Sequence, residues 1–204
     1  EKLLLMVGHD LRSPLHFLGL LAENMRESVA NGEQDKISSA TEEIRDTTLK
    51  LHAFVEEFSL WARLQDEQYN LHKKNFSLYS LLEDLNHFFS EALLAHNNYM
   101  ELPIDQGQEI YTNYELLKAI LRNLIDNANK HTRNGHIRIS WQKNNDTGPQ
   151  LCISDTGNGM SPLELNNIRR RIVQFQEPTA TKPGSQLGYQ LIIDFAARLD
   201  LSLH

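Results

Sequence analysis

The sequence predicts a two-part fold of class α followed by α/β, in which an antiparallel hairpin of two long helices precedes an α/β sandwich. Two observations carry this prediction. Near the start of the chain, apolar residues return every seven positions, which is the repeat of helices that pack in pairs. Beyond a polar stretch, short alternating segments typical of strands stand beside helical ones. We therefore expect a hairpin over 1–66, a linker over 67–75 and an α/β domain over 76–204.

The composition narrows the class of function. The 204 residues carry a net charge of −7, so the chain lacks the general basic surface that binds nucleic acid. A single cysteine, Cys152, cannot form an internal disulfide, which fits a reducing compartment. No apolar run approaches the roughly 20 residues that cross a bilayer. Both ends fall inside periodic segments, so we expect a fragment, truncated at its C-terminus, whose membrane contact would lie outside it.

The first two helices are predicted by heptads on either side of Asn31-Gly32, a pair that ends a helix. The first apolar series comprises Leu4, Leu11, Leu18 and Met25, with Leu15, Leu21 and Val29 widening the stripe. The second comprises Ile37, Ile44, Leu51 and Phe58, each followed three residues later by Ala40, Thr47, Phe54 or Trp61. One hairpin cannot bury two apolar seams, which favours a homodimeric four-helix bundle. The alternative is a hairpin that packs on its own downstream domain.

The second part mixes helices and strands without strict alternation. Helices are expected over 76–95 after a short extended entry, then 114–131, 162–175 and 189–199, and short strands over 99–102 and 109–112. Residues 135–141 alternate as a strand should. Their antiparallel partner is expected at 150–154, across the turn at 144–148.

A histidine near the start of the first helix is the first candidate site. With Leu4 at heptad position a, His9 falls at f, which points away from the seam, and so does His16. The neighbours favour His9. Asp10 can hold one ring nitrogen and leave the other free to attack, while Ser13 lies one turn on and Pro14 loosens that turn. The alternative is an ordinary exposed histidine.

A polar stripe on the helix over 114–131 is the second candidate site. It consists of Asn123, Asn127, Lys130 and His131, at positions i, i+4, i+7 and i+8. Amide oxygens are acceptable ligands for Mg²⁺, and a lysine one turn further can meet phosphate. A solvated helix face would explain the same pattern.

Two glycine-containing segments follow. Asp155 comes directly after a predicted strand, with Gly157 and Gly159 allowing the backbone to pass close to a ligand. Gly184 and Gly188 open the last helix, where backbone amides suit phosphate. Each segment is a weak signal by itself. Their fixed order behind a histidine-bearing hairpin makes them strong together.

In this order the motifs resemble the catalytic core of a bacterial sensor histidine kinase of a two-component system. Residues 6–15 resemble its phosphoacceptor box, 123–132 its asparagine box, and 155–160 and 184–189 its two glycine boxes. The resemblance implies a dimerisation and phosphotransfer hairpin, then an ATP-binding domain of the fold shared with gyrase, Hsp90 and MutL. It implies ATP and Mg²⁺ as ligands, and a response-regulator receiver domain, separate or fused, as partner. It also implies the cytoplasmic portion of a membrane-bound sensor.

The resemblance implies a role for each matched residue. His9 is the nucleophile that is phosphorylated, Asp10 orients it and takes its proton, and Ser13 positions water for dephosphorylating the regulator. The expected nucleotide ligands are Asn127 through Mg²⁺, Asn123 in support, Lys130 and His131 on phosphate or ribose, Asp155 on the adenine amino group, Gly157 and Gly159 shaping the pocket, and Gly184 and Gly188 flanking the lid and phosphates.

The sequence departs from the family pattern in the last segment. Gln186 stands where a glycine is usual, the lid is short, and Phe175 is all that remains of a phenylalanine box. Arg169-Arg170-Arg171 in this lid reads equally as a triphosphate contact or a solvated helix end. These departures keep a second hypothesis open, a weak or inactive dimeric signalling scaffold that still binds nucleotide. A third, an ATPase that uses water, is disfavoured because Asn123 replaces the glutamate that activates water in the gyrase and Hsp90 branches.

Overall fold

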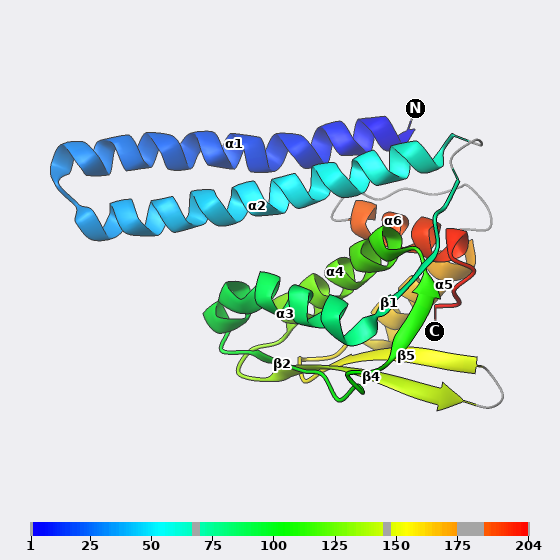
Figure 1. The fold of residues 1–204 in the computed structure, drawn as a ribbon. Helices are drawn as coiled ribbons and strands as arrows, with labels where there is room; N and C mark the ends of the chain where they lie inside the picture. The colour runs from blue at the N-terminus through cyan, green and yellow to red at the C-terminus, as the bar shows by residue number, and fades with distance from the viewer. Residues whose placement is uncertain (1, 67–69, 145–147, 175–185, 204) are drawn as a thin grey trace. The chain divides into compact units, whose positions relative to one another are not determined.

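The chain forms two compact units, Glu1–Tyr69 with Gly184–Leu187 and Asn70–Pro183 with Gly188–His204. The computed structural model describes residues 2–66, 70–144, 148–174 and 186–203, and the side chains of 2–7, 9–10, 143–144, 171–174 and 186–190 lie outside that description. The units are a helical hairpin and an α/β unit with a mixed sheet, which confirms the predicted fold class (Figure 1).

The hairpin consists of α1 (Lys2–Asn31) and α2 (Gln34–Leu64), which run antiparallel along their length (Figure 1). The sequence pair Asn31-Gly32 sets the turn. Gly32 has φ +71°, and its N–H donates to the carbonyl of Val29 while the N–H of Glu33 donates to that of Ser28. These two bonds satisfy carbonyls in the last turn of α1. They require a left-handed backbone conformation at Gly32, which glycine adopts at little energetic cost.

The heptads place their residues along the contact between the two helices. Ala40 is buried, and most other described seam residues are half-buried. Leu21 is 7% exposed, but Leu15 and Val29, expected to widen the same stripe, are 54% and 58% exposed. Both fall at heptad position e, beside the seam, so the second helix of the same chain does not cover them.

The α/β unit contains nine helices and strands within the described residues. They are β1 (Lys74–Ser77), α3 (Leu78–Ala95), β2 (Tyr99–Glu101), β3 (Glu109–Thr112), α4 (Tyr114–His131), β4 (His136–Asn144), β5 (Gly148–Asp155), α5 (Pro162–Gln174) and α6 (Gln186–Arg198). The extended entry before α3 is a paired strand, because β1 is antiparallel to β3. It takes Lys74 and Asn75 out of the expected linker.

The main sheet has the order β2-β4-β5. Strand β2 is parallel to β4, and β4 is antiparallel to β5, with Trp141 opposite Leu151 and Asn144 opposite Gly148. The expected pairing of these two strands is confirmed. Asp155 at the end of β5 stands opposite Ile137, so the candidate carboxylate lies beside the start of β4.

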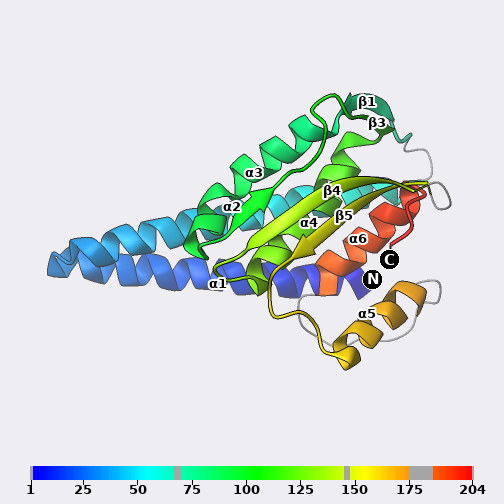
Figure 2. The same cartoon turned by 90° about the horizontal axis from the view of Figure 1, so that it is seen from below.

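The core of this unit lies between the helices and one face of the sheet. Helices α3 and α4 contact each other and the sheet, and α6 lies on the same side (Figures 1 and 2). The fully buried side chains include Leu82, Leu116, Ile137, Ile139 and Phe195. Side-chain caps define where α3 and α4 begin. Ser77 caps α3 by accepting from the N–H of Ser80, and Asn113 caps α4 by accepting from the N–H of Leu116. Among the described helices, none has the length and apolar character needed to cross a membrane.

Candidate functional site

The phosphoacceptor candidates lie on α1. His9 and Asp10 are in its second and third turns, and their side chains lie outside the described residues. Ser13 is exposed, one turn further on, and the helix continues through Pro14. A Cβ added at Gly8, directly before His9, would meet nothing within 4 Å.

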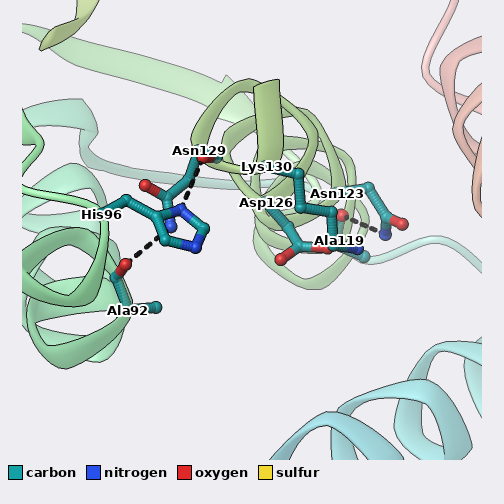
Figure 3. A network of polar contacts seen from close by, with 7 residues as sticks. All are labelled: Ala92, His96, Ala119, Asn123, Asp126, Asn129 and Lys130. Atoms are coloured by element: carbon teal, nitrogen blue, oxygen red, sulfur yellow. Dashed lines mark hydrogen bonds and ion pairs between the residues drawn. The ribbon is translucent and has the colours of Figure 1, made fainter. Parts of the chain in front are cut away.

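The polar stripe on α4 divides into two levels of exposure. Asn123 and Asn127 are half-buried, whereas Lys130 and His131 are exposed. Asn123 donates from Nδ2 to the carbonyl of Ala119, 3.0 Å away, and Lys130 forms an ion pair with Asp126 one turn back (Figure 3). The amide of Asn127 has no hydrogen bond within the described residues. The amide oxygen of Asn127 is thus available to a ligand.

The carboxylate of Asp155 lies at the end of β5, next to the end of α4. Its Oδ1 accepts from the N–H of Gly157 at 2.9 Å, and the hydroxyl of Thr132 stands 3.5 Å from the same oxygen. A Cβ built on Gly157 would lie 2.3 Å from the carbonyl oxygen of His131. The glycine turn therefore sits directly on the last residue of the asparagine-bearing helix, and the two sequence motifs meet at one place.

The remaining glycines have different surroundings. Gly159 has φ +67° and an open space where a Cβ would be, so its conformation and not its packing requires glycine. Gly184 and Phe175 lie outside the described residues. Gly188 is the third residue of α6, two positions after Gln186, with which the helix begins. Arg169 and Arg170 are exposed on α5.

Helix α5 begins with a reciprocal cap. Glu164 accepts from the N–H and the hydroxyl of Ser161 at 2.8 and 2.7 Å, and the hydroxyl of Ser161 accepts from the N–H of Glu164 at 3.3 Å. These bonds from the Ser161 hydroxyl and backbone hold the pKa of Glu164 below its ordinary value, with a smaller contribution from His131. The cap fixes where the chain leaves the glycine turn.

Sequence analysis missed a set of residues that surround this junction. They are Asn98, Asn129, Thr132 and Gly135, of which the first three are buried. Asn129 falls within the asparagine-rich helix but outside its polar stripe, and it donates to the carbonyl of Ala92 at 3.0 Å (Figure 3). Asn129 lies two residues after Asn127, and residues two apart point to nearly opposite sides of an α-helix. This spacing was the signal that could have separated Asn129 from the polar stripe.

One known family matches the second part of the chain. Residues 112–201 match the family described as histidine kinase-, DNA gyrase B- and HSP90-like ATPase, and this stretch runs from the last residue of β3 to just beyond the end of α6. It contains the asparagine stripe and both glycine segments.

Curated relatives extend the similarity across the hairpin. The chain is 26% identical over 94% of its length to the phosphate regulon sensor protein PhoR of Haemophilus influenzae, and 26% identical over 89% to sensor protein SrrB of Staphylococcus aureus. The similarity to these named sensor proteins extends over most of this chain, which spans 44% and 31% of the two relatives. The histidine kinase AdeS of Acinetobacter baumannii has the same fold, with a TM-score of 0.58 at 19% identity over 93% of this chain and 86% of the other.

Proposed function

We propose that the chain is the catalytic core of an ATP-dependent protein-histidine kinase, which phosphorylates His9 and passes the phosphoryl group to an aspartate of a response-regulator receiver domain. Residues 1–66 carry the nucleophile and the dimer interface, 67–75 link the parts, and 76–204 bind ATP. The observation that carries the proposal is the contact of Gly157 with the His131 carbonyl. It places the exposed carboxylate of Asp155 beside the helix that bears Asn127 and Lys130.

Base recognition falls to Asp155. Its carboxylate is exposed, and one oxygen is already oriented by the N–H of Gly157. A carboxylate accepts a hydrogen bond from the amino group of adenine, whereas guanine presents a carbonyl oxygen at the same place. This arrangement favours ATP over GTP. Gly157 and Gly159 shape the turn beneath the base, and Gly184 and Gly188 flank the lid and the phosphates.

Phosphate binding falls to the polar stripe of α4. The unpaired amide oxygen of Asn127 suits Mg²⁺, which accepts hard oxygen ligands together with phosphate oxygens and water. The described residues hold no group of three His, Cys, Asp or Glu side chains that could bind a metal alone, as fits an ion shared with phosphates. When bound, Mg²⁺ neutralises phosphate charge. Asn123 supports this surface, and Lys130 and His131 contact phosphate or ribose.

The transfer needs no water. A ring nitrogen of His9 attacks the γ-phosphorus, an N–P bond forms as the bond to the ADP oxygen breaks, and the ring proton passes to Asp10. A carboxylate oxygen of the receiver aspartate then displaces the imidazole. Asn123 supports transfer over hydrolysis, because its amide cannot accept a proton and its Nδ2 donates to the Ala119 carbonyl.

The partners follow from the same reading. We assign the hairpin to a homodimer, because Leu15 and Val29 remain exposed beside its seam. The solved relative ThkA is in complex with the response regulator protein TrrA, and the relative ShkA with AMPPNP. Relatives named LuxQ are autoinducer 2 sensor kinase/phosphatases. Ser13, exposed one turn from His9, is our candidate for positioning water in such a phosphatase step.

One observation favours the second candidate, a signalling scaffold that binds nucleotide without transfer. Lys130 is paired with Asp126 in this structure, so its charge is partly neutralised before any phosphate arrives. A scaffold of this kind would bind ATP through Asp155 yet leave His9 unmodified.

The test is incubation of the protein with γ-labelled ATP and Mg²⁺. We expect acid-labile, alkali-stable label on the protein, lost in His9→Gln and retained in His16→Gln, the matched control at the next f position. Asn127→Ala should abolish the label as well. Nucleotide binding without label would establish the scaffold, and released phosphate without labelled protein would establish an ATPase.

A further inference from the structure

A buried asparagine outside the nucleotide motifs holds the turn on which Asp155 depends. Asn98 lies in the turn between α3 and β2 and is 7% exposed. Its Nδ2 donates to Oδ1 of Asn129 at 2.8 Å and to the carbonyl of Thr132 at 2.9 Å, while its Oδ1 accepts from the N–H of Gly135 at 3.1 Å. Three of the four hydrogen bonds that a primary amide can form are therefore made within the protein.

Two of these bonds fix the two ends of the turn Thr132–Gly135, which joins α4 to β4. The main chain adds two more: the N–H of Asn134 donates to the carbonyl of His96, and the N–H of Tyr99 donates to that of Gly135. Asn129 anchors Asn98 in turn, because its Nδ2 donates to the carbonyl of Ala92 in α3. The turn after the asparagine-bearing helix is thus fixed to the end of α3.

The other side of this turn carries the candidate base-recognition residue. Thr132 is fully buried, and its hydroxyl faces Oδ1 of Asp155 at 3.5 Å. A Cβ added at Gly135 would lie 2.1 Å from Oγ1 of Thr156, which accepts from the N–H of His136 at 2.9 Å. The turn therefore lies between Asn98 on one side and the segment Asp155–Gly157 on the other.

We propose that Asn98, anchored by Asn129, is a positioning residue for nucleotide binding. It acts through the Thr132–Gly135 turn to hold Asp155 in the orientation that selects adenine. This inference rests on the proposed function, in which Asp155 accepts from the base. Asn98 touches no nucleotide itself. Its loss leaves the Gly135 N–H without its side-chain acceptor and removes one of the two side-chain donors to the Thr132 carbonyl, the other being Nη1 of Arg133 at 2.9 Å. The turn therefore loosens while the surrounding main-chain bonds persist.

A matched control, Asn113, lies at the N-terminal end of α4, whereas the turn Thr132–Gly135 follows its C-terminal end. Asn113 is 8% exposed, accepts from the N–H of Leu116 at 2.9 Å and donates to the carbonyl of His72 at 3.0 Å. Asn113→Ala also removes a buried amide from this unit and lowers its stability. It does so far along α4 from Asp155.

The test compares Asn98→Ala with Asn113→Ala in ATP and GTP affinity and in amide hydrogen exchange. We expect Asn98→Ala to weaken ATP binding about tenfold, because the charge-assisted hydrogen bond from the adenine amino group to Asp155 is misplaced. The ratio of ATP affinity to GTP affinity should fall as well. Exchange at the amides of Gly135, Thr156 and Gly157 should accelerate. Asn113→Ala should change neither selectivity nor exchange at these amides. Thr132→Val, nearly isosteric, should reproduce the loss of selectivity in a folded protein.

The outcomes separate the inference from the proposed function. Unchanged exchange at Gly157 in Asn98→Ala overturns the inference, whether or not nucleotide binds. Equal effects of the two asparagine variants on selectivity also overturn it. If Asp155→Asn leaves ATP affinity and selectivity intact, the assignment of Asp155 fails, and the base-orienting role of Asn98 fails with it, even where exchange responds as expected.

Discussion

Gly157 and His131 are in van der Waals contact through backbone atoms, since a Cβ on the glycine would stand 2.3 Å from the histidine carbonyl oxygen and 2.9 Å from its carbonyl carbon. Neither neighbour is the flexible end of a side chain that could turn away. The glycine of this motif is therefore required by the protein's own main chain, whatever ligand it also approaches. That requirement locks the end of β5 to the end of α4.

Gly157→Ala is expected to destabilise the α/β unit and to weaken ATP binding together. Overpacking of this kind against fixed atoms costs about 1–3 kcal/mol. Gly159→Ala should cost about 1 kcal/mol, through its positive φ alone, because its Cβ would meet nothing. Denaturant unfolding of both variants measures the difference. Equal destabilisation by the two substitutions would contradict the contact with His131.

The ion pair between Asp126 and Lys130 leads to a prediction on phosphate binding. Both side chains are partly exposed, at 36% and 59%, so Asp126→Asn should change stability by less than about 0.5 kcal/mol. The same substitution releases Lys130 and should tighten ATP binding, while Lys130→Ala should weaken it about tenfold. Titration with ATP and with adenosine measures both effects, and adenosine affinity should stay unchanged.

Glu115→Gln is the control for net charge, since it removes one carboxylate from the first turn of the same helix. If Glu115→Gln tightens ATP binding as much as Asp126→Asn does, the effect is long-range electrostatics and not release of Lys130.

The cap of α5 gives a prediction on pH. Hydrogen bonds from Ser161 lower the pKa of Glu164 from its ordinary value of 4.5. Because the folded pKa is the lower one, the contribution of this carboxylate to stability is complete above 4.5 and is lost as the pH falls through the folded value. Carboxyl carbon NMR should show Glu164 titrating below 4.5, and Ser161→Ala should move it upward. Ser161→Thr, which keeps the hydroxyl, should not, and a shift there would argue against the cap.

Local patterns predicted most of the elements. The bounds of α4 agree with the helix expected over 114–131, because an asparagine cap and an unbroken apolar face act within one segment. The β4–β5 pairing followed from alternation on both sides of a turn. By contrast, the pairing of β1 with β3 joins residues far apart in sequence, and Lys74 and Asn75 carry no alternation that shows it.

The sequence predicts the candidate ligands of the site, but it does not predict the residues that support them. Asn127 and Asp155 are readable because motif and periodicity mark them. Asn98 is not, since the two asparagines after α3 indicate only a helix end: Asn97 has φ +54° and closes that end. The partners of Asn98 come from the turn after α4, more than 30 residues away. Long-range hydrogen bonds of this kind leave no period in a sequence.

The exposed apolar residues of the hairpin lead to a prediction on assembly. Leu15 and Val29 are 54% and 58% exposed and flank the seam of α1. Because each side chain is already partly covered, burying the rest against a second copy would contribute about 1–1.5 kcal/mol, and each counts twice in a symmetric dimer. The double substitution Leu15→Ser and Val29→Ser should therefore convert a dimer to a monomer in sedimentation measurements. Leu94→Ser, at a residue that is 77% exposed in the α/β unit, should leave the dimer intact. A monomeric unsubstituted chain, or equal dissociation by Leu94→Ser, would mean that the hairpin seam is not the interface.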